Sequence, residues 1–225
     1  MLTALTTLLL SATVISAQDL YYVGSDGSWS NADNWSTSPD GQGDSGLPNE
    51  NTSVHFLSSS NVIITEDQAF EVSNVFINAP SFSTEGSLVI HQSLSIHGDS
   101  YVQNGIEFVG TAEHSISAVG QLFSDLNLSG DCSLESPLLL GKENNLSIDS
   151  GSLTANNKAI ALGGFNAENS HTELLLSGAK IIVQDHISVH PSIDDLNAGS
   201  VFWISSGVPV ASVETGQFGY STENQ

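Results

Sequence analysis

Residues 88–110 read LVIHQSLSIHGDSYVQNGIEFVG. Leu94 and Ile96 alternate with a serine, and a glycine follows at the next turn. Ile106 and Phe108 alternate with a glutamate in the same way, again with a glycine after them. Alternation with a period of two is typical of a β-strand that buries one of its sides. This stretch therefore predicts short strands joined by sharp turns.

The same pattern continues as far as residue 204, so the chain is expected to be all-β. No window keeps a 3.6-residue period, and no helix is predicted beyond the first seventeen residues. Two further strands are predicted upstream, at Val62–Ile64 and at Val72–Ile77. The residues predicted to face the core are Leu94, Ile96, Ile106, Phe108, Leu126, Leu128, Leu146, Ile148, Ile160, Leu162, Leu174 and Leu176.

Glycines add a longer period, because eight of them follow one another at intervals of 10 to 12 residues. Glycine supplies the positive-φ corners at which a strand turns onto the next face. Two such units give a coil of about twenty residues, within the repeat lengths of solenoids. The spacing predicts a single-stranded parallel β-helix, a β-solenoid, over residues 58–225. The glycines are Gly86, Gly98, Gly110, Gly120, Gly130, Gly141, Gly151 and Gly163.

A β-sandwich is the alternative fold, since it also shows turn signals every 8–12 residues. Hairpins favour Asn-Gly and Asp-Gly turns, and between these strands only Asn104-Gly105 fits. The scarcity of such turns favours the solenoid.

The segment 18–57 has a different composition, rich in Trp, Tyr, Ser, Asn, Asp and Gly. An open solenoid end would expose core and backbone edge. We therefore expect this segment to be an N-terminal aromatic cap.

Residues 1–17 contain a short apolar run that ends in Ser16 and Ala17. This pattern indicates a secretory signal peptide, too short to span a bilayer. The protein is accordingly expected to be secreted, extracellular and associated with the cell surface. Cys132 is the only cysteine, which excludes an internal disulfide, and we expect its thiol to be buried in the core.

The charge balance limits the partners, because 25 Asp and Glu stand against three lysines and no arginine. Nucleic-acid binding needs cations that neutralise phosphates, and it is disfavoured here. Polyanionic substrates and anionic membranes are disfavoured for the same reason.

The opening of the chain resembles that of large exported repeat proteins of gram-negative bacteria. The matching residues are Gly27-Ser-Trp29, Asn34-Trp-Ser36, Pro48 and Val54-His-Phe56, preceded by Tyr21-Tyr-Val-Gly24. The resemblance implies β-helical repeats, an adhesin-like function and, in many members, export by the type IX route. No C-terminal sorting domain is recognisable, so we expect this chain to be the front of a longer protein.

Two sets of residues are candidates for binding. Asp33, Asp40, Asp44 and Glu50 offer hard oxygen ligands on a glycine-rich segment, as calcium prefers, although the spacing of an EF-hand loop is not present. The alternative is a solvated turn without a metal, and no other cofactor is expected.

Trp29 and Trp35 could form a platform on which sugars stack. The alternative is that both rings close the end of the core, and this interpretation is favoured because both lie in the predicted cap.

Catalysis is not expected. A glycosidase needs two carboxylates at a set separation, and the adjacent Asp194 and Asp195 would point to opposite sides of a strand. The histidine pairs His91/His97 and His186/His190 have no third ligand at metal spacing.

The sequence thus favours a non-catalytic structural or adhesion module at the cell surface. Its partners would be extracellular glycans, surfaces or other surface proteins. A calcium-dependent carbohydrate-binding module and a fragment of a glycan-active β-helix enzyme are the alternatives.

We predict that the protein does not bind heparin, because the polyanion would meet 25 acidic groups and only three cations. The check is chromatography on immobilised heparin in ~0.15 M salt, where surface electrostatics still act over about 8 Å. Elution in the flow-through is expected. Retention would contradict the electrostatic argument.

Overall fold

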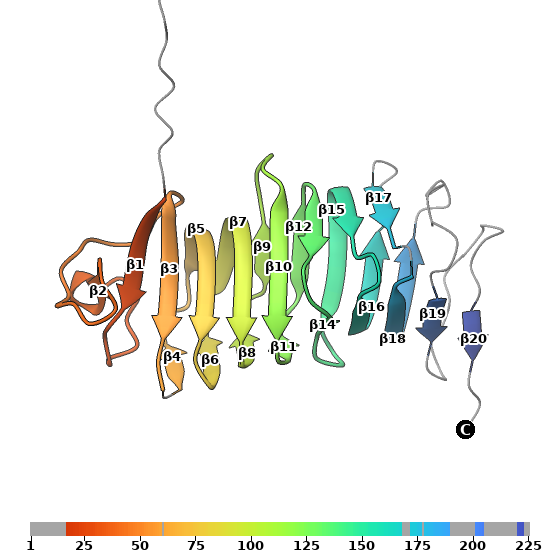
Figure 1. Cartoon of the computed structure of the whole chain (residues 1–225). Coiled ribbons are helices and arrows are strands. Elements are labelled where there is room, and N and C mark those ends of the chain that lie inside the picture. Colours follow the sequence, from red (N-terminus) through yellow and green to blue (C-terminus); the bar gives the residue numbers. More distant parts are fainter. Residues whose placement is uncertain are drawn as a thin grey trace, which may run out of the picture.

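The computed structural model describes residues 17–59, 61–167, 172–176, 178–189, 201–204 and 220–222. In this part of the chain nearly all regular structure is β, and the one helix is the 3-10 turn η1 (Ala32–Asn34). Parallel strands stack side by side from the N-terminal to the C-terminal end (Figure 1). The predicted parallel β-solenoid is confirmed, and the β-sandwich alternative is excluded.

Each coil contributes strands to three faces. The first face is formed by β1 (Gln18–Tyr22), β3 (Thr52–Leu57), the ends of β5 (Ala69–Asn78) and β7 (Ser87–His97), β10 (His114–Val119), β13 (Cys132–Leu134), the end of β15 (Asn145–Thr154) and β17 (Thr172–Leu175). The third face is formed by the beginnings of β5, β7 and β15, by β9 (Ile106–Phe108) and β12 (Leu126–Ser129), and by the ends of β16 (Ala159–Ala167) and β18 (Lys180–Val189).

The second face lies between these two along the chain. It is formed by β4 (Val62–Ile64), β6 (Ser81–Thr84), β8 (Asp99–Val102), β11 (Leu122–Phe123), β14 (Leu138–Leu139), the beginnings of β16 and β18, β19 (Val201–Ile204) and β20 (Tyr220–Thr222).

Consecutive coils are in register. On the first face Val54, Val75, Leu94, Ile116 and Leu134 are successive Cα partners, so one coil takes about twenty residues, as the glycine spacing predicts. All five side chains are buried and form one column of the core. The twelve residues predicted to face the core are likewise all buried.

Glycine recurs at the corners of the coils for two different reasons. Gly98, Gly110, Gly120, Gly130 and Gly151 have positive φ, as predicted, whereas Gly86, Gly141 and Gly163 do not. These three are limited by space instead. A Cβ on Gly86 would lie 2.2 Å from the Gln68 carbonyl oxygen, and one on Gly163 would lie 2.4 Å from that of Lys142.

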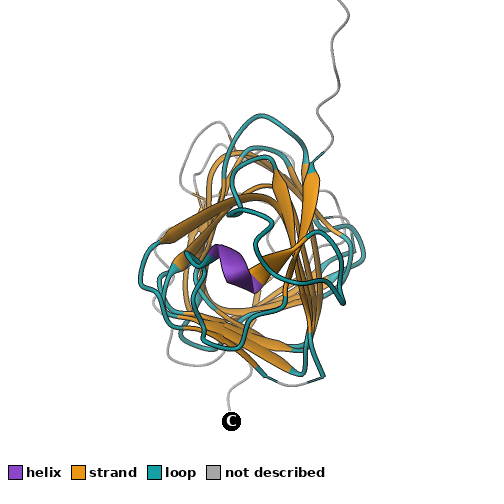
Figure 2. Cartoon of the chain, turned by 90° about the vertical axis from the view of Figure 1, so that its left-hand side faces the viewer, coloured by secondary structure: helices purple, strands orange, loops and turns teal. Residues whose placement is uncertain are grey.

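The N-terminal end of the core is covered by the segment between β1 and β3. β1 pairs in parallel with β3 and therefore already belongs to the first face, while β2 (Trp35–Ser36) pairs antiparallel with β1. Figure 2, viewed from this end, shows η1 across the mouth of the coil. This covering segment, residues 23–51, is the cap.

Two tryptophans of the cap are buried in the end of the core. Trp35 is fully buried, and Trp29 is 5% exposed. Their ring centroids lie 4.9 Å apart, and Trp29 stacks on Phe70 at 4.3 Å. The Trp35 indole nitrogen donates to the Trp29 carbonyl oxygen at 2.8 Å, so its one polar group is satisfied.

Glu66, which follows β4, attaches the cap to the first coil. Its carboxylate accepts hydrogen bonds from the Ser28 hydroxyl, from the Ser30 amide and hydroxyl, and from the Gln68 amide group. Burial alone would raise the pKa of Glu66, but these hydrogen bonds to the charged form outweigh it and lower the pKa.

Cys132 and His114 are among the polar side chains that the coils enclose. Cys132 is buried as predicted, and burial, with a smaller contribution from the charge of Glu113, raises the pKa of its thiol to about 12. Its register partner His114 is fully buried, and neither ring nitrogen has a hydrogen-bond partner among the described residues.

We predict that Leu128→Asp prevents folding, whereas Asn127→Asp is tolerated. Leu128 is fully buried, and its burial contributes ~1.5–3 kcal/mol. A carboxylate there would also be an unpaired buried charge. Asn127 is its exposed neighbour on the same strand and supplies the matched control. Circular dichroism of the two purified variants checks this, and a folded Leu128→Asp variant would contradict the register.

We predict that Glu66→Gln lowers the melting temperature at pH 7 and has a smaller effect at pH 3. A lowered pKa in the folded state means that the stabilisation is present above the unfolded pKa of about 4.3. It is lost as the pH falls through the folded-state value. Thermal melts at the two pH values measure this, with the exposed Glu85→Gln as control. An equal effect of Glu66→Gln at both pH values would refute the proposed role of the charge.

Candidate functional site

Large apolar side chains gather on the outside of the second face. Of eight large hydrophobic residues that are exposed in the described chain, five occupy outward positions of second-face strands, and Leu57 and Val119 end first-face strands beside them. Monomeric proteins rarely expose large contiguous apolar patches, and such patches are often binding sites. The five residues are named the apolar strip here: Ile63, Tyr101, Phe123, Leu139 and Ile182.

The strip follows the axis of the solenoid. Ile63, Ser83, Tyr101 and Phe123 are successive register partners in four neighbouring coils. Phe123 also covers Gly141 in the next coil, because a Cβ there would lie 3.1 Å from its ring.

Beyond Phe123 the strip moves to the neighbouring outward position. Leu122 and Leu140 are register partners, so Phe123 lies one residue after this inward row and Leu139 lies one residue before it. Ala161 and Ile182 are the next register partners of Leu139 and continue its row. Neighbouring coils lie ~4.8 Å apart, so the strip extends across seven coils over roughly 30 Å.

Acidic residues line the edge of the strip. The turns that lead from the second to the third face carry exposed carboxylates in four of five successive coils, the exception being the turn with Gln103 and Asn104. These carboxylates are named the acidic border: Asp67, Glu85, Asp125 and Glu143. One lysine lies among them, since Lys142 Nζ is 3.7 Å from Glu143 Oε1. The surface beside the apolar strip is therefore strongly negative.

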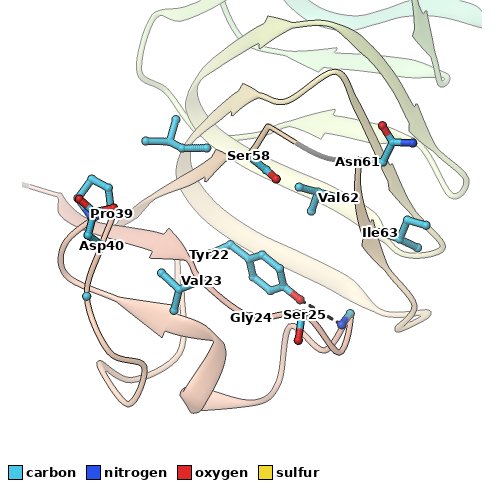
Figure 3. A pocket seen from close by; sticks show the side chains of 13 residues that line it. Tyr22, Val23, Gly24, Ser25, Pro39, Asp40, Ser58, Asn61, Val62 and Ile63 are labelled. Carbon is cyan, nitrogen blue, oxygen red and sulfur yellow. Dashed lines mark hydrogen bonds between the residues drawn. The ribbon is translucent and has the colours of Figure 1, made fainter.

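A pocket of about 650 Å³ opens at the N-terminal end of the strip, between the cap and the second face. Leu57 and Ile63 form part of its wall, so pocket and strip are continuous. Figure 3 shows Tyr22 in the middle of the pocket, Pro39 and Asp40 on the cap side, and Asn61, Val62 and Ile63 on the opposite side.

Tyr22 is held in a fixed position in the middle of the pocket. The Gly27 amide donates to the Tyr22 hydroxyl oxygen at 3.1 Å, which fixes the ring (Figure 3). Burial raises the pKa of Tyr22, and the charges of Asp26 and Glu66 add to this effect. Among the described residues that line the pocket, Asp40 is the one with a carboxylate.

The four predicted calcium ligands are not brought together. Asp40 lines the pocket, and Asp44 lies in the cap, where its amide donates to the Ala32 carbonyl oxygen. The Asp33 amide donates to the Asn31 side chain at the start of η1. Glu50 lies on another side of the molecule, where it meets Glu71 and His91.

Glu50, Glu71 and His91 form a group that sequence reasoning missed. One potential ligand atom of each lies within 4.8 Å of the others. The spacing in the sequence could have revealed this group, because positions 50, 71 and 91 lie about one coil apart. His91 is grouped with the two glutamates and not with His97. The side chains of His186, His190, Asp194 and Asp195 lie outside the described part of the chain, and so do residues 1–16 of the predicted signal peptide.

Trp29 and Trp35 do not form an exposed aromatic platform, the less favoured of the two interpretations of these residues. The Trp29 and Trp35 rings extend from the cap into the core, so neither ring offers a face on which a sugar could stack. The exposed rings of the second face, Tyr101 and Phe123, come instead from a part of the sequence without any aromatic motif.

Comparison with protein-family models, with curated protein sequences and with solved structures gave no match for this chain. A search of the described residues found no helix with the length and apolar character that crossing a membrane requires. The fold and the surface just described are therefore the basis for assigning a function.

Proposed function

We propose that this chain is a non-catalytic extracellular adhesion module that binds a protein partner through the apolar strip and the adjoining pocket. The observation that carries the proposal is the collection of exposed apolar side chains on one face of an otherwise acidic rod. Secretion and presentation at the cell surface, as in the β-helical proteins that the opening residues resemble, belong to the same proposal.

The composition of the strip favours protein over glycan as the partner. Three of its five side chains are aliphatic, and the remaining outward positions between them include Ser83 and Ala161. Glycan recognition depends on aromatic faces combined with many hydrogen-bonding groups. Aliphatic residues with a central aromatic pair match the apolar core of a protein–protein interface, and Tyr and Phe are enriched there.

The acidic border specifies the charge of the partner. A partner that covers the apolar strip brings its own rim close to Asp67, Glu85, Asp125 and Glu143. Complementary charge at the rim increases the association rate and excludes partners of the same sign. The partner is therefore a surface with apolar residues in the middle and Lys or Arg at its edge. A second copy of this acidic chain would instead be repelled.

We predict that the protein binds an amphipathic 18-residue peptide with leucines on one side and lysines on the other. The double variant Tyr101→Ser, Phe123→Ser should bind it at least tenfold more weakly, since hot-spot side chains at the centre of an interface contribute most of the affinity. Glu85→Gln with Glu143→Gln should mainly slow association and reduce its dependence on salt. Surface plasmon resonance measures both effects.

The third face offers a matched control. Val89→Ser with Glu107→Gln removes one apolar and one acidic side chain from register partners on that face, and binding should not change. A scrambled peptide of the same composition should bind at least tenfold more weakly. Equal binding of the scrambled peptide, or an equal loss in the third-face variant, would show general charge attraction and refute the proposal.

Three other results would also refute it. A dimer that the second-face variants abolish would mean self-association. Glycan-array binding lost in those variants would favour the carbohydrate-binding alternative. Release of reducing ends from a polysaccharide by the purified protein would favour an enzyme.

A further inference from the structure

We propose that Glu50, Glu71 and His91 form a binding site for a divalent transition metal ion, best matched by Zn²⁺. The site lies where the third face turns into the first, away from the apolar strip. It is therefore independent of the proposed adhesion function. Its ligands come from three parts of the chain that are distant in sequence: the end of the cap, β5 and β7.

The separation of the three ligand atoms is close to that required for tetrahedral coordination of an ion. The three ligand atoms lie within 4.8 Å of one another, and bonds of ~2.0–2.2 Å place tetrahedral ligands about 3.4 Å apart. The Glu71 side chain is 53% exposed and that of His91 is 29% exposed, with Oε1 and Nε2 2.9 Å apart. Rotation of the two exposed glutamate side chains can therefore bring the three ligand atoms to tetrahedral spacing. Metal binding displaces to solvent any proton that the two groups share.

The backbone positions His91 for this role. Between Val72 and Asn74 the register with β7 shifts, so that His91 and Gln92 lie opposite the single residue Ser73. Such a β-bulge redirects a side chain and often occurs beside functional sites. Gly110 lies next to the imidazole ring, since a Cβ on this glycine would lie 3.6 Å from His91 Nδ1. Because glycine has no Cβ, Gly110 leaves that side of the ring uncovered.

The local charge calls for a cation. Glu50 and Glu71 approach each other closely, and residues 1–141 contain sixteen Asp and Glu and no Lys or Arg. Like charges at this distance repel, and His91 can offset at most one of them. A divalent ion neutralises both carboxylates together.

The ligand set selects the kind of ion. Imidazole nitrogen suits Zn²⁺ and its first-row neighbours, whereas Ca²⁺ takes six to eight oxygen ligands. Three protein ligands leave positions for water or a further ligand. Room for these exists, because pockets of about 560 and 450 Å³ flank the group, each lined by Glu50. One of them also offers Asn51, Ser73 and Gln92.

Binding would have a structural consequence. Glu50 precedes β3 at the end of the cap, while Glu71 and His91 belong to the two following coils of the third face. An ion shared by all three would link the cap to the solenoid in addition to the hydrogen bonds that Glu66 accepts from the cap. The melting temperature should then rise with Zn²⁺, because a ligand that binds only the folded state stabilises it.

The test is isothermal titration of ZnCl₂ into the intact chain in a phosphate-free buffer, together with thermal melts with and without Zn²⁺. One equivalent should bind, with a rise in melting temperature that EDTA reverses. His91→Ala, Glu71→Gln and Glu50→Gln should each weaken binding at least tenfold and remove the rise. His97→Ala, at the exposed end of the same strand, is the matched control and should behave like the wild type.

Any of the following results would overturn the proposed metal site. Zn²⁺ binding that persists in His91→Ala or is lost in His97→Ala would place it elsewhere. Binding of Ca²⁺ but not Zn²⁺ would contradict the role of the imidazole. If Zn²⁺ changes neither heat nor melting temperature in the wild-type chain, the group is only a hydrogen-bonded His91–Glu71 pair with a neighbouring carboxylate.

Discussion

Parallel stacking in register is the constraint on which the rest of this structure depends. Each residue lies on its counterpart in the next coil, at the ~4.8 Å spacing of hydrogen-bonded strands. A position that faces the core must therefore be apolar in coil after coil, as the column from Val54 to Leu134 is. Where two corners touch, no side chain fits at all. A Cβ on Gly120 would lie 2.3 Å from the Gly98 carbonyl oxygen, and one on Gly151 would lie 2.3 Å from the Gly130 carbonyl carbon.

The same constraint governs the outside, where it explains how a folded chain can carry 25 acidic residues. Like charges directly opposite each other in neighbouring strands are destabilising. In the outward row of the third face, Glu71 is followed by Val89, then Glu107 and then Asn127, so a neutral residue separates the two glutamates. On the first face Asp19 is hydrogen-bonded to His55, and the His55 ring stacks between Tyr21 and Phe76 at 4.6 Å from each.

The sequence predicted the interior well because burial leaves a local pattern. Alternation identifies Leu126 and Leu128 as inward from three residues alone, and the glycine interval gives the length of a coil. The surface could not be predicted in this way. Period two separates inside from outside, but it does not tell which of three faces carries Tyr101 or Phe123. That assignment depends on where each corner falls, and corners without positive φ, such as Gly86, are set by contacts with the preceding coil.

Side-chain groups that span coils were harder still to predict. The contact of Glu66 with Ser28 and Ser30 joins residues almost two coils apart, through a cap whose path follows no repeat. Glu50, Glu71 and His91 do follow the coil length, but the calcium hypothesis joined Glu50 to aspartates that are near it only in sequence. In a solenoid, neighbours in space are better sought one coil apart than a few residues apart.

The coil architecture also determines how this molecule responds to mechanical force. Hydrogen bonds between coils run along the axis of the rod, so tension on its two ends loads the outermost coil first. A coil that detaches gives up ~4.8 Å of rod but releases about twenty residues, which extend to roughly 65 Å. Without a disulfide to fix any coil, since Cys132 is the only cysteine, the chain can lengthen by stages while the remaining coils stay folded. Under tension this architecture is therefore expected to lengthen coil by coil, and not in a single step.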